Sequence, residues 1–170
     1  QGARVLNVVM PAVLDLLGTE VAAQVLHQCG AAHHAATVSA YEQCAHQQDV
    51  RVVPFIDDMA GAYAQADLVL CRAGALTIAE LCAVGIASIL VPFPHAADDH
   101  QTANARHLAG RGAALLLPEA ELNPARLAGL IRELNAERDR LVVMAMAARR
   151  LSQPDAARDV GRICMEALRA

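Results

Sequence analysis

The first seventeen residues carry apolar side chains at the spacing of an amphipathic helix. These side chains recur three and four residues apart, which places them on one face of a helix and leaves the opposite face polar. The pattern predicts that the chain opens with a helix packed on a core. The apolar positions are Val5, Leu6, Val9, Met10, Val13, Leu16 and Leu17.

After Gly18, short apolar runs alternate with segments of helical spacing. Such alternation, with runs this short and this apolar, is typical of a parallel sheet covered on both faces. We therefore expect an α/β fold, with a Rossmann-like parallel sheet and helices on both faces. Asp57 is the expected N-cap of the predicted helix at 59–65. The predicted strands are 25–29, 51–56, 67–71, 88–91 and 113–117, and the predicted helices are 35–44, 59–65, 76–84 and 100–109.

From Pro118 onward the pattern is helical only. Asn123 and Pro124 supply a cap and a first helical position, and further helices are predicted over 137–151 and 154–168. A chain of 170 residues can bury one good core and is short for two. We expect a single ligand-binding domain over residues 1–170, with a helical carboxyl-terminal segment over 119–170.

Composition narrows the range of partners. All fourteen basic residues are Arg, so neither a Walker-type lysine nor a lysine Schiff base is available in the chain. The net charge is −4, and two Phe, two Tyr and no Trp offer little stacking surface, so no nucleic-acid partner is expected. No apolar run approaches the roughly 18 residues of a membrane span. The five cysteines, odd in number and without a CxxC pair, are expected to be buried thiols in a reducing cytoplasm.

The most informative segment is residues 67–80, where an apolar run breaks into a small-residue turn and resumes with helical spacing. A strand, turn and helix in this order aim backbone N–H groups and a helix dipole at one point, which suits a diphosphate. Arg72 and Thr77 flank the turn, and Glu80 could accept two hydrogen bonds from a ribose diol. The alternative is an ordinary tight turn followed by a surface glutamate.

A second polar segment, residues 92–104, opens a helix after a buried strand. Gln101 and Asn104 share a helix face, and their carboxamides both donate and accept, as recognition of sugar hydroxyls requires. Either Asp98 or Asp99 could simply cap the helix. A metal site that includes His95 is a further alternative, although the spacing fits no familiar pattern.

A third segment, residues 55–59, offers either a helix cap with two core residues or an apolar wall and backbone edge for a flat base. The histidines at positions 27, 33 and 34 are expected to be structural or solvent-facing. No Ser-His-Asp or Cys-His arrangement has supporting context in the sequence.

Four motifs together resemble the MurG family, in order and at the family's spacing. They are Gln-Gly-Ala-Arg at 1–4, Phe-Ile-Asp-Asp-Met at 55–59, the segment 66–80 that contains Cys-Arg-Ala-Gly-Ala-Leu-Thr-Ile-Ala-Glu, and Pro-Phe-Pro-His-Ala-Ala-Asp-Asp-His-Gln-Thr-Ala-Asn-Ala at 92–105. The resemblance implies the carboxyl-terminal half of a GT-B glycosyltransferase, the domain that binds UDP-N-acetylglucosamine. Members of the family transfer N-acetylglucosamine to undecaprenyl-pyrophosphoryl-muramoyl-pentapeptide and so convert lipid I to lipid II.

The resemblance also implies roles for individual residues. Glu80 would hold the uridine ribose, Ile56 would meet the uracil through its backbone, and the turn at 72–77 would take the diphosphate and outer sugar hydroxyls. Arg72 would stabilise the leaving group, without a metal or cofactor. Ala73 and His100 stand where some members have Ser and Gln. The implied substrate-binding residues are Ile56, Gly74, Ala75, Leu76, Thr77, Glu80, His100, Gln101 and Asn104.

In this family another, amino-terminal domain supplies the acceptor cleft, the membrane-facing patch and the catalytic base. We therefore expect the acceptor domain to be absent from this chain, which alone would bind donor without transferring sugar. A strand and a Gly-Gly-Ser turn are expected to precede residue 1. The whole enzyme would act peripherally at the cytoplasmic face of the bacterial inner membrane, by inverting transfer.

Two alternatives remain open at this point. One is a stand-alone donor-binding subunit recruited by a membrane partner, and the other is a GT-B epimerase acting on UDP-N-acetylglucosamine. The reading frame upstream of Gln1 separates the first alternative from a two-domain transferase. An assay for UDP release against sugar isomerisation separates the second.

Overall fold

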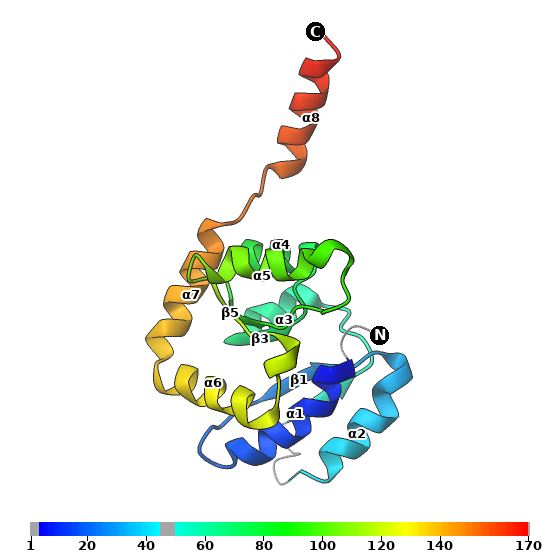
Figure 1. Cartoon of the computed structure of the whole chain (residues 1–170), viewed down its shortest axis with the longest axis vertical. Helices are drawn as coiled ribbons and strands as arrows, with labels where there is room; N and C mark the ends of the chain where they lie inside the picture. The colour runs from blue at the N-terminus through cyan, green and yellow to red at the C-terminus, as the bar shows by residue number, and fades with distance from the viewer. Residues whose placement is uncertain (1–3, 45–49, 170) are drawn as a thin grey trace.

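In the computed structural model the chain forms an alternating α/β body from which one helix extends (Figure 1). The structure describes residues 4–44 and 50–169. The predicted order of elements is confirmed, and the boundaries of two predicted helices, 59–65 and 100–109, agree to the residue. The α-helices are α1 (Arg4–Leu17), α2 (His34–Glu42), α3 (Met59–Gln65), α4 (Ala75–Val84), α5 (His100–Ala109), α6 (Pro124–Ala136), α7 (Arg138–Arg150) and α8 (Ala156–Ala167), with short 3₁₀ turns at Ala31–His33, Ala97–Asp99 and Glu119–Glu121.

Every strand pairing among the described residues is parallel, as the alternation predicts, but these pairings fall into two groups. One group has the order β1-β2 and the other the order β3-β4-β5. A doubly wound sheet of the order 3-2-1-4-5-6 would have one further strand between β1 and β3. The expected strand before α1 stays a prediction. The strands are β1 (Val25–Gln28), β2 (Val50–Val53), β3 (Leu68–Cys71), β4 (Ala87–Leu90) and β5 (Ala114–Leu116).

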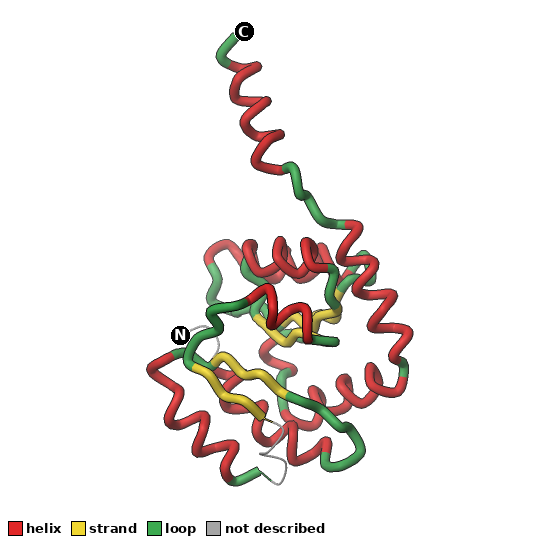
Figure 2. The backbone as a smooth tube through the Cα atoms, turned by 180° about the vertical axis from the view of Figure 1, so that it is seen from behind, coloured by secondary structure: helices red, strands yellow, loops and turns green. Residues whose placement is uncertain are grey.

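Strand β4 shows why the sheet needs cover on both faces. Its residues are all buried, and successive side chains enter different cores because strand side chains alternate. Ala87 and Ile89 join the core formed with α1 and α6, whereas Leu90 joins the core formed with α4 and α5. In Figure 2 the strands lie in the middle of the body, with helices around them.

Two sequence predictions need correction. The N-cap of α3 is Asp58 and not Asp57, because the Asp58 carboxylate accepts a hydrogen bond from the N–H of Gly61 at 2.8 Å. The cysteines are not all buried, since Cys164 is exposed and Cys71 is only partly buried. Cys164 lies on α8, which contributes no buried residue.

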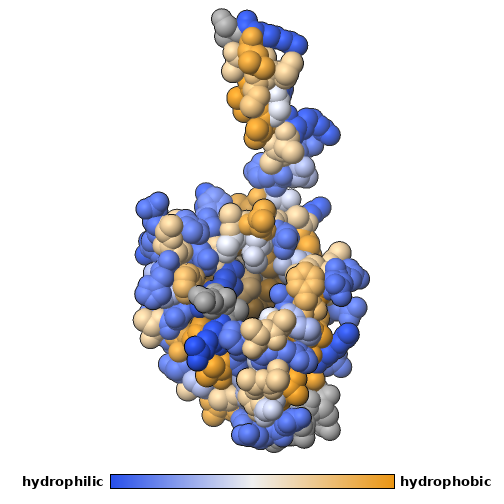
Figure 3. Space-filling model, turned by 90° about the vertical axis from the view of Figure 1, so that its right-hand side faces the viewer, coloured by the Kyte–Doolittle hydropathy of each residue, from blue (hydrophilic) through white to orange (hydrophobic). Residues whose placement is uncertain are grey.

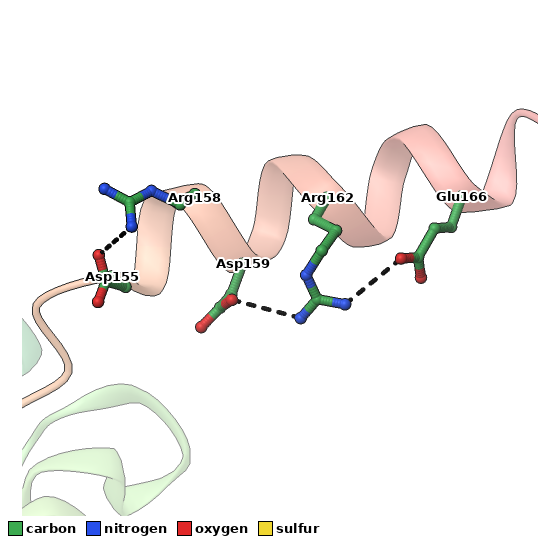
Figure 4. Close-up of polar contacts among 5 residues, drawn as sticks. All are labelled: Asp155, Arg158, Asp159, Arg162 and Glu166. Atoms are coloured by element: carbon green, nitrogen blue, oxygen red, sulfur yellow. Dashed lines mark hydrogen bonds and ion pairs between the residues drawn. The ribbon is translucent and has the colours of Figure 1, made fainter.

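Helix α8 stands clear of the body (Figure 1) and exposes apolar side chains, among them Val160, Ile163 and Leu168. Figure 3 shows hydrophobic surface along the protruding helix. Its polar side carries ion pairs, with Arg162 between Asp159 and Glu166 (Figure 4). Among the described helices, none combines the length and apolar character needed to cross a membrane.

Candidate functional site

The junction between β3 and α4 forms the turn that the sequence predicts. Gly74 is the N-cap of α4, and no side chain caps the N–H groups that follow it. The positive end of the helix dipole and these first-turn N–H groups therefore point out of α4 without a capping partner. Gly74 has an ordinary extended backbone, and a Cβ added there would meet only Thr77 Oγ1, at 3.7 Å. The fold itself does not require glycine at this position.

Glu80 lies in the second turn of α4 and is exposed, with a defined partner on α3. The buried Tyr63 hydroxyl donates a hydrogen bond to Glu80 Oε2 at 3.0 Å. Burial raises the pKa of Tyr63, and the hydrogen bond to the Glu80 carboxylate raises it further. Tyr63 therefore stays protonated at physiological pH and holds one carboxylate oxygen, while the other can accept hydrogen bonds from a ligand.

Arg72, which follows β3, contacts the segments that follow β4 and β5. Its Nη1 donates to the carbonyl oxygens of Val91 and Pro92 at 3.2 and 3.1 Å, and its Nη2 forms an ion pair with Glu119 at 2.5 Å. The guanidinium also lies over the Phe93 ring, 5.3 Å from its centroid. The Arg72 charge is thus balanced by a carboxylate from the segment after β5.

The two carboxamides of α5 bond to the same loops. Asn104 Nδ2 donates to the carbonyl oxygen of Ala73 at 2.9 Å, which fixes the turn before α4. Gln101 Oε1 accepts a hydrogen bond from the N–H of Phe93 at 3.0 Å. Each carboxamide uses one end on the backbone, so that Asn104 Oδ1 and Gln101 Nε2 can serve a ligand.

The loop before α5 turns sharply. Asp98 and Asp99 both have a φ of 50°, in the left-handed region that non-glycine residues seldom adopt. The Asp99 side chain does not cap a backbone N–H of α5, because it accepts a hydrogen bond from the Thr102 hydroxyl at 2.5 Å. His100 Nδ1 donates to the Ala97 carbonyl at 2.6 Å. Asp99 is the N-cap residue of α5, so the capping alternative is right for its position and wrong for its side chain.

Ile56 belongs to a second cluster, at the ends of β1 and β2. Its N–H donates to Gln28 Oε1 at 3.3 Å, and Cys29 N–H donates to the Val53 carbonyl at 3.0 Å. The structure thus brings Arg72, Gln101 and Asn104 together around the loops after β3 and β4. It places Ile56 with the loops after β1 and β2, on the other group of strands.

Sequence reasoning missed three partners of these residues, namely Tyr63, Gln28 and Glu119. Tyr63 is the buried residue of α3. Helical spacing can predict that its side chain lies in the core, but not that it contacts Glu80. Glu119 lies far from Arg72 in the sequence, and nothing local signals the pair. Within residues 4–44 and 50–169, no group of three or more His, Cys, Asp or Glu side chains could hold a metal ion. Residues 1–3 of the Gln-Gly-Ala-Arg motif at 1–4 lie outside the described residues.

The parallel strands, the helices on both faces and the polar loops at the strand ends define the Rossmann-like carboxyl-terminal half of a GT-B glycosyltransferase. Residues 1–160 match the model of the glycosyltransferase family 28 C-terminal domain, and the chain belongs to this family.

Curated relatives carry one common name. A protein of Nitrosococcus oceani named UDP-N-acetylglucosamine--N-acetylmuramyl-(pentapeptide) pyrophosphoryl-undecaprenol N-acetylglucosamine transferase is 56% identical over 166 residues, which make up 98% of this chain and 46% of that protein. A protein of the same name from Azotobacter vinelandii is 49% identical over 168 residues, covering 99% of this chain and 47% of that protein. The chain therefore spans about half the length of these relatives.

Solved structures agree with these relatives. The crystal structure of Acinetobacter baumannii MurG matches with a TM-score of 0.89 at 42% identity, over 97% of this chain and 47% of that one. The glycosyltransferase VinC, solved in complex with dTDP, matches with a TM-score of 0.67 at 24% identity, over 94% and 38% of the two chains, and shows the fold alone. The resemblance to the MurG family that the sequence motifs indicate is confirmed.

Proposed function

We propose that this chain is the donor-binding domain of a transferase that moves N-acetylglucosamine from UDP-N-acetylglucosamine to a lipid-linked muramoyl-pentapeptide. The observation that carries the proposal is the start of α4, where uncapped N–H groups follow a glycine that the fold does not require. A diphosphate fits this position because it accepts hydrogen bonds from N–H groups and is attracted by the helix dipole. Gly74, Ala75, Leu76 and Thr77 would form the diphosphate side of the site.

The nucleoside would lie between Glu80 and Ile56. The Tyr63 hydroxyl holds one oxygen of the Glu80 carboxylate, which leaves the other for the ribose hydroxyls. The Ile56 backbone would meet the uracil edge, with its N–H kept at 3.3 Å from Gln28 Oε1. A hydrogen bond of that length is weak, so the N–H can be shared with an acceptor on the base.

The sugar would contact the loops that α5 stabilises. Asn104 and Gln101 hold the Ala73 and Phe93 backbones with one end of each carboxamide and would offer the other end to sugar hydroxyls. His100, at the first position of α5, would take part through its ring, whose Nδ1 is already bonded to Ala97. The support for these roles is the placement of α5 beside the β3–α4 turn.

Inverting transfer places negative charge on the departing diphosphate as the acceptor hydroxyl attacks the anomeric carbon. The α4 N-terminus would stabilise that charge, and a comparable loss of electrostatic stabilisation costs about 10² to 10³ in rate. The leaving-group role of Arg72 stays a prediction. Because its charge is paired with Glu119, we propose that Arg72 acts first by holding the loops after β3 and β4 in register.

The acceptor, the catalytic base and a peripheral position at the inner membrane would belong to another domain. The relatives named as transferases are about twice as long as this chain, which favours the two-domain protein over a stand-alone subunit. The chain by itself would bind the donor and transfer no sugar.

Calorimetric titration of the 170-residue chain with UDP tests the proposal. The Glu80→Ala variant should bind UDP about ten- to a hundredfold more weakly, because hydrogen bonds to a charged group contribute roughly 1.5–3 kcal/mol. Glu133→Ala, which removes another exposed helical glutamate, is the matched control and should leave UDP affinity unchanged. The site is wrong if the wild-type chain shows no UDP-dependent heat, or if the two variants bind alike.

A further inference from the structure

A buried polar network joins α1, β1 and α2 beneath the Ile56 cluster. His27 Nδ1 lies 2.7 Å from the Tyr41 hydroxyl, and His27 Nε2 lies 2.9 Å from Asn7 Oδ1. Asn7 Nδ2 in turn donates to the carbonyl oxygen of Cys29 at 3.0 Å. The exposed fractions of Asn7, His27 and Tyr41 are 6%, 8% and 3%. None of the three has a role in the donor site proposed above.

The hydrogen bonds fix the state of every member. The Asn7 Nδ2 group donates to the Cys29 carbonyl, which leaves Asn7 Oδ1 facing His27 Nε2. Because Oδ1 can only accept, His27 carries its proton on Nε2. His27 Nδ1 must then accept from the Tyr41 hydroxyl. Burial lowers the pKa of His27, in agreement with a neutral ring. An apolar trio would fill this space without directional bonds, whereas the network allows one arrangement only.

The network holds both neighbours of Gln28. His27 precedes Gln28 on β1, and Cys29, whose carbonyl Asn7 binds, follows it. Since strand side chains alternate, His27 points into the core while Gln28 is exposed on the other side. Gln28 Oε1 then accepts the hydrogen bond from the Ile56 N–H. The Asn7 carboxamide is therefore two contacts away from the backbone group that would meet the base.

We propose that Asn7, His27 and Tyr41, acting through Gln28, are positioning residues that set the Ile56 backbone for recognition of a uracil base. This inference rests on the proposed function, in which Ile56 meets the base. A backbone N–H complements the O4 acceptor of uracil and not the N4 amino group of cytosine. Selectivity for UDP over CDP consequently depends on where the Ile56 N–H lies.

The test measures the ratio of dissociation constants for CDP and UDP by calorimetry on the 170-residue chain, together with the melting temperature of each variant. His27→Leu removes both hydrogen bonds at similar volume and should lower the ratio about fivefold. His27→Gln, which keeps one donor and one acceptor, should restore most of the ratio. Gln28→Ala changes an exposed side chain, leaves the core intact, and should also lower the ratio.

Thr37→Val is the control for a purely structural effect. Thr37 is a buried polar residue on α2 whose hydroxyl donates to the carbonyl oxygen of His33, the N-cap of the same helix, at 2.9 Å. This variant should lower the melting temperature without changing the CDP to UDP ratio. An unchanged ratio in both His27→Leu and Gln28→Ala would overturn the positioning role while leaving the donor site standing. Wild-type chain that binds UDP and CDP equally would overturn it as well, and absence of any nucleotide binding would overturn the proposed function too.

Discussion

Replacement of Arg72 by Met should destabilise the chain far more than replacement of any exposed arginine. The Arg72 side chain is 14% exposed and its partner Glu119 is 28% exposed, so both charges are largely withdrawn from water. The substitution keeps an unbranched apolar stem but removes the guanidinium. It leaves the Glu119 carboxylate without its cation and two carbonyl groups, those of Val91 and Pro92, without a donor.

The contacts give the size of the effect. Removal of one partner from a buried ion pair costs about 3–5 kcal/mol, and the partial exposure of Glu119 reduces this. Each carbonyl that loses its donor adds about 1 kcal/mol at most where water can enter. We expect Arg72→Met to lower the free energy of unfolding by about 3 kcal/mol, which corresponds to roughly 6–12 °C in melting temperature for a chain of this size.

Urea unfolding followed by circular dichroism measures this free energy directly, since the chain has no Trp to report by fluorescence. Glu119→Gln and the double variant complete a mutant cycle, whose coupling energy should be about 2 kcal/mol. Arg138→Met is the control, because the Arg138–Asp67 ion pair is exposed at 60% and 71% and should contribute less than about 1 kcal/mol. If Arg72→Met and Arg138→Met unfold at the same urea concentration, the ion pair does not hold these loops.

Three further outcomes follow from single groups. Burial lowers the pKa of His27, so below about pH 6.5 the unfolded chain binds more protons than the folded one. The free energy of unfolding should therefore be highest above this pH and fall as the pH drops. Urea unfolding between pH 5 and 8 should show a weaker dependence of this free energy on pH for His27→Gln. Burial raises the pKa of Tyr41 and Tyr63, so absorbance titration should find no tyrosinate at pH 10 until the chain unfolds. Gly85 has a φ of +74°, and a Cβ there would lie 2.9 Å from Arg149 Cβ. Gly85→Ala should therefore lower the free energy of unfolding by about 2 kcal/mol, as calorimetry can measure. An unchanged melting temperature would contradict the crowding.

Local sequence patterns predict much of the fold. Helices α3 and α5 agree with prediction to the residue because apolar periodicity and a polar start define both. The prediction of Asp57 as the N-cap of α3 is wrong. Adjacent aspartates give the same local signal, and only the backbone decides that the Asp58 carboxylate reaches the N–H of Gly61. The division of the strands into two groups depends on pairing between distant segments, which periodicity does not encode.

The candidate site divides in the same way. The β3–α4 turn and the carboxamides of α5 could be found from residue type and spacing. Their backbone partners could not, because the Asn104 contact with Ala73 and the Arg72 contact with Glu119 join segments that are remote in the chain. Asn7 could not be singled out for another reason, since it lies outside the predicted apolar face of its helix and its backbone partner, Cys29, is 22 residues away in the sequence.

The protruding helix α8 makes one cysteine chemically distinct from the rest. Cys164 is exposed, whereas Cys29, Cys44 and Cys82 are buried, and burial raises the pKa of Cys44 and Cys82. Burial raises the pKa of Cys71 to about 12, so this thiol also carries almost no thiolate at neutral pH. A maleimide dye should therefore attach first at Cys164. The chain thus holds a natural single-site labelling position on α8, from which energy transfer could follow the approach of any surface that covers the helix.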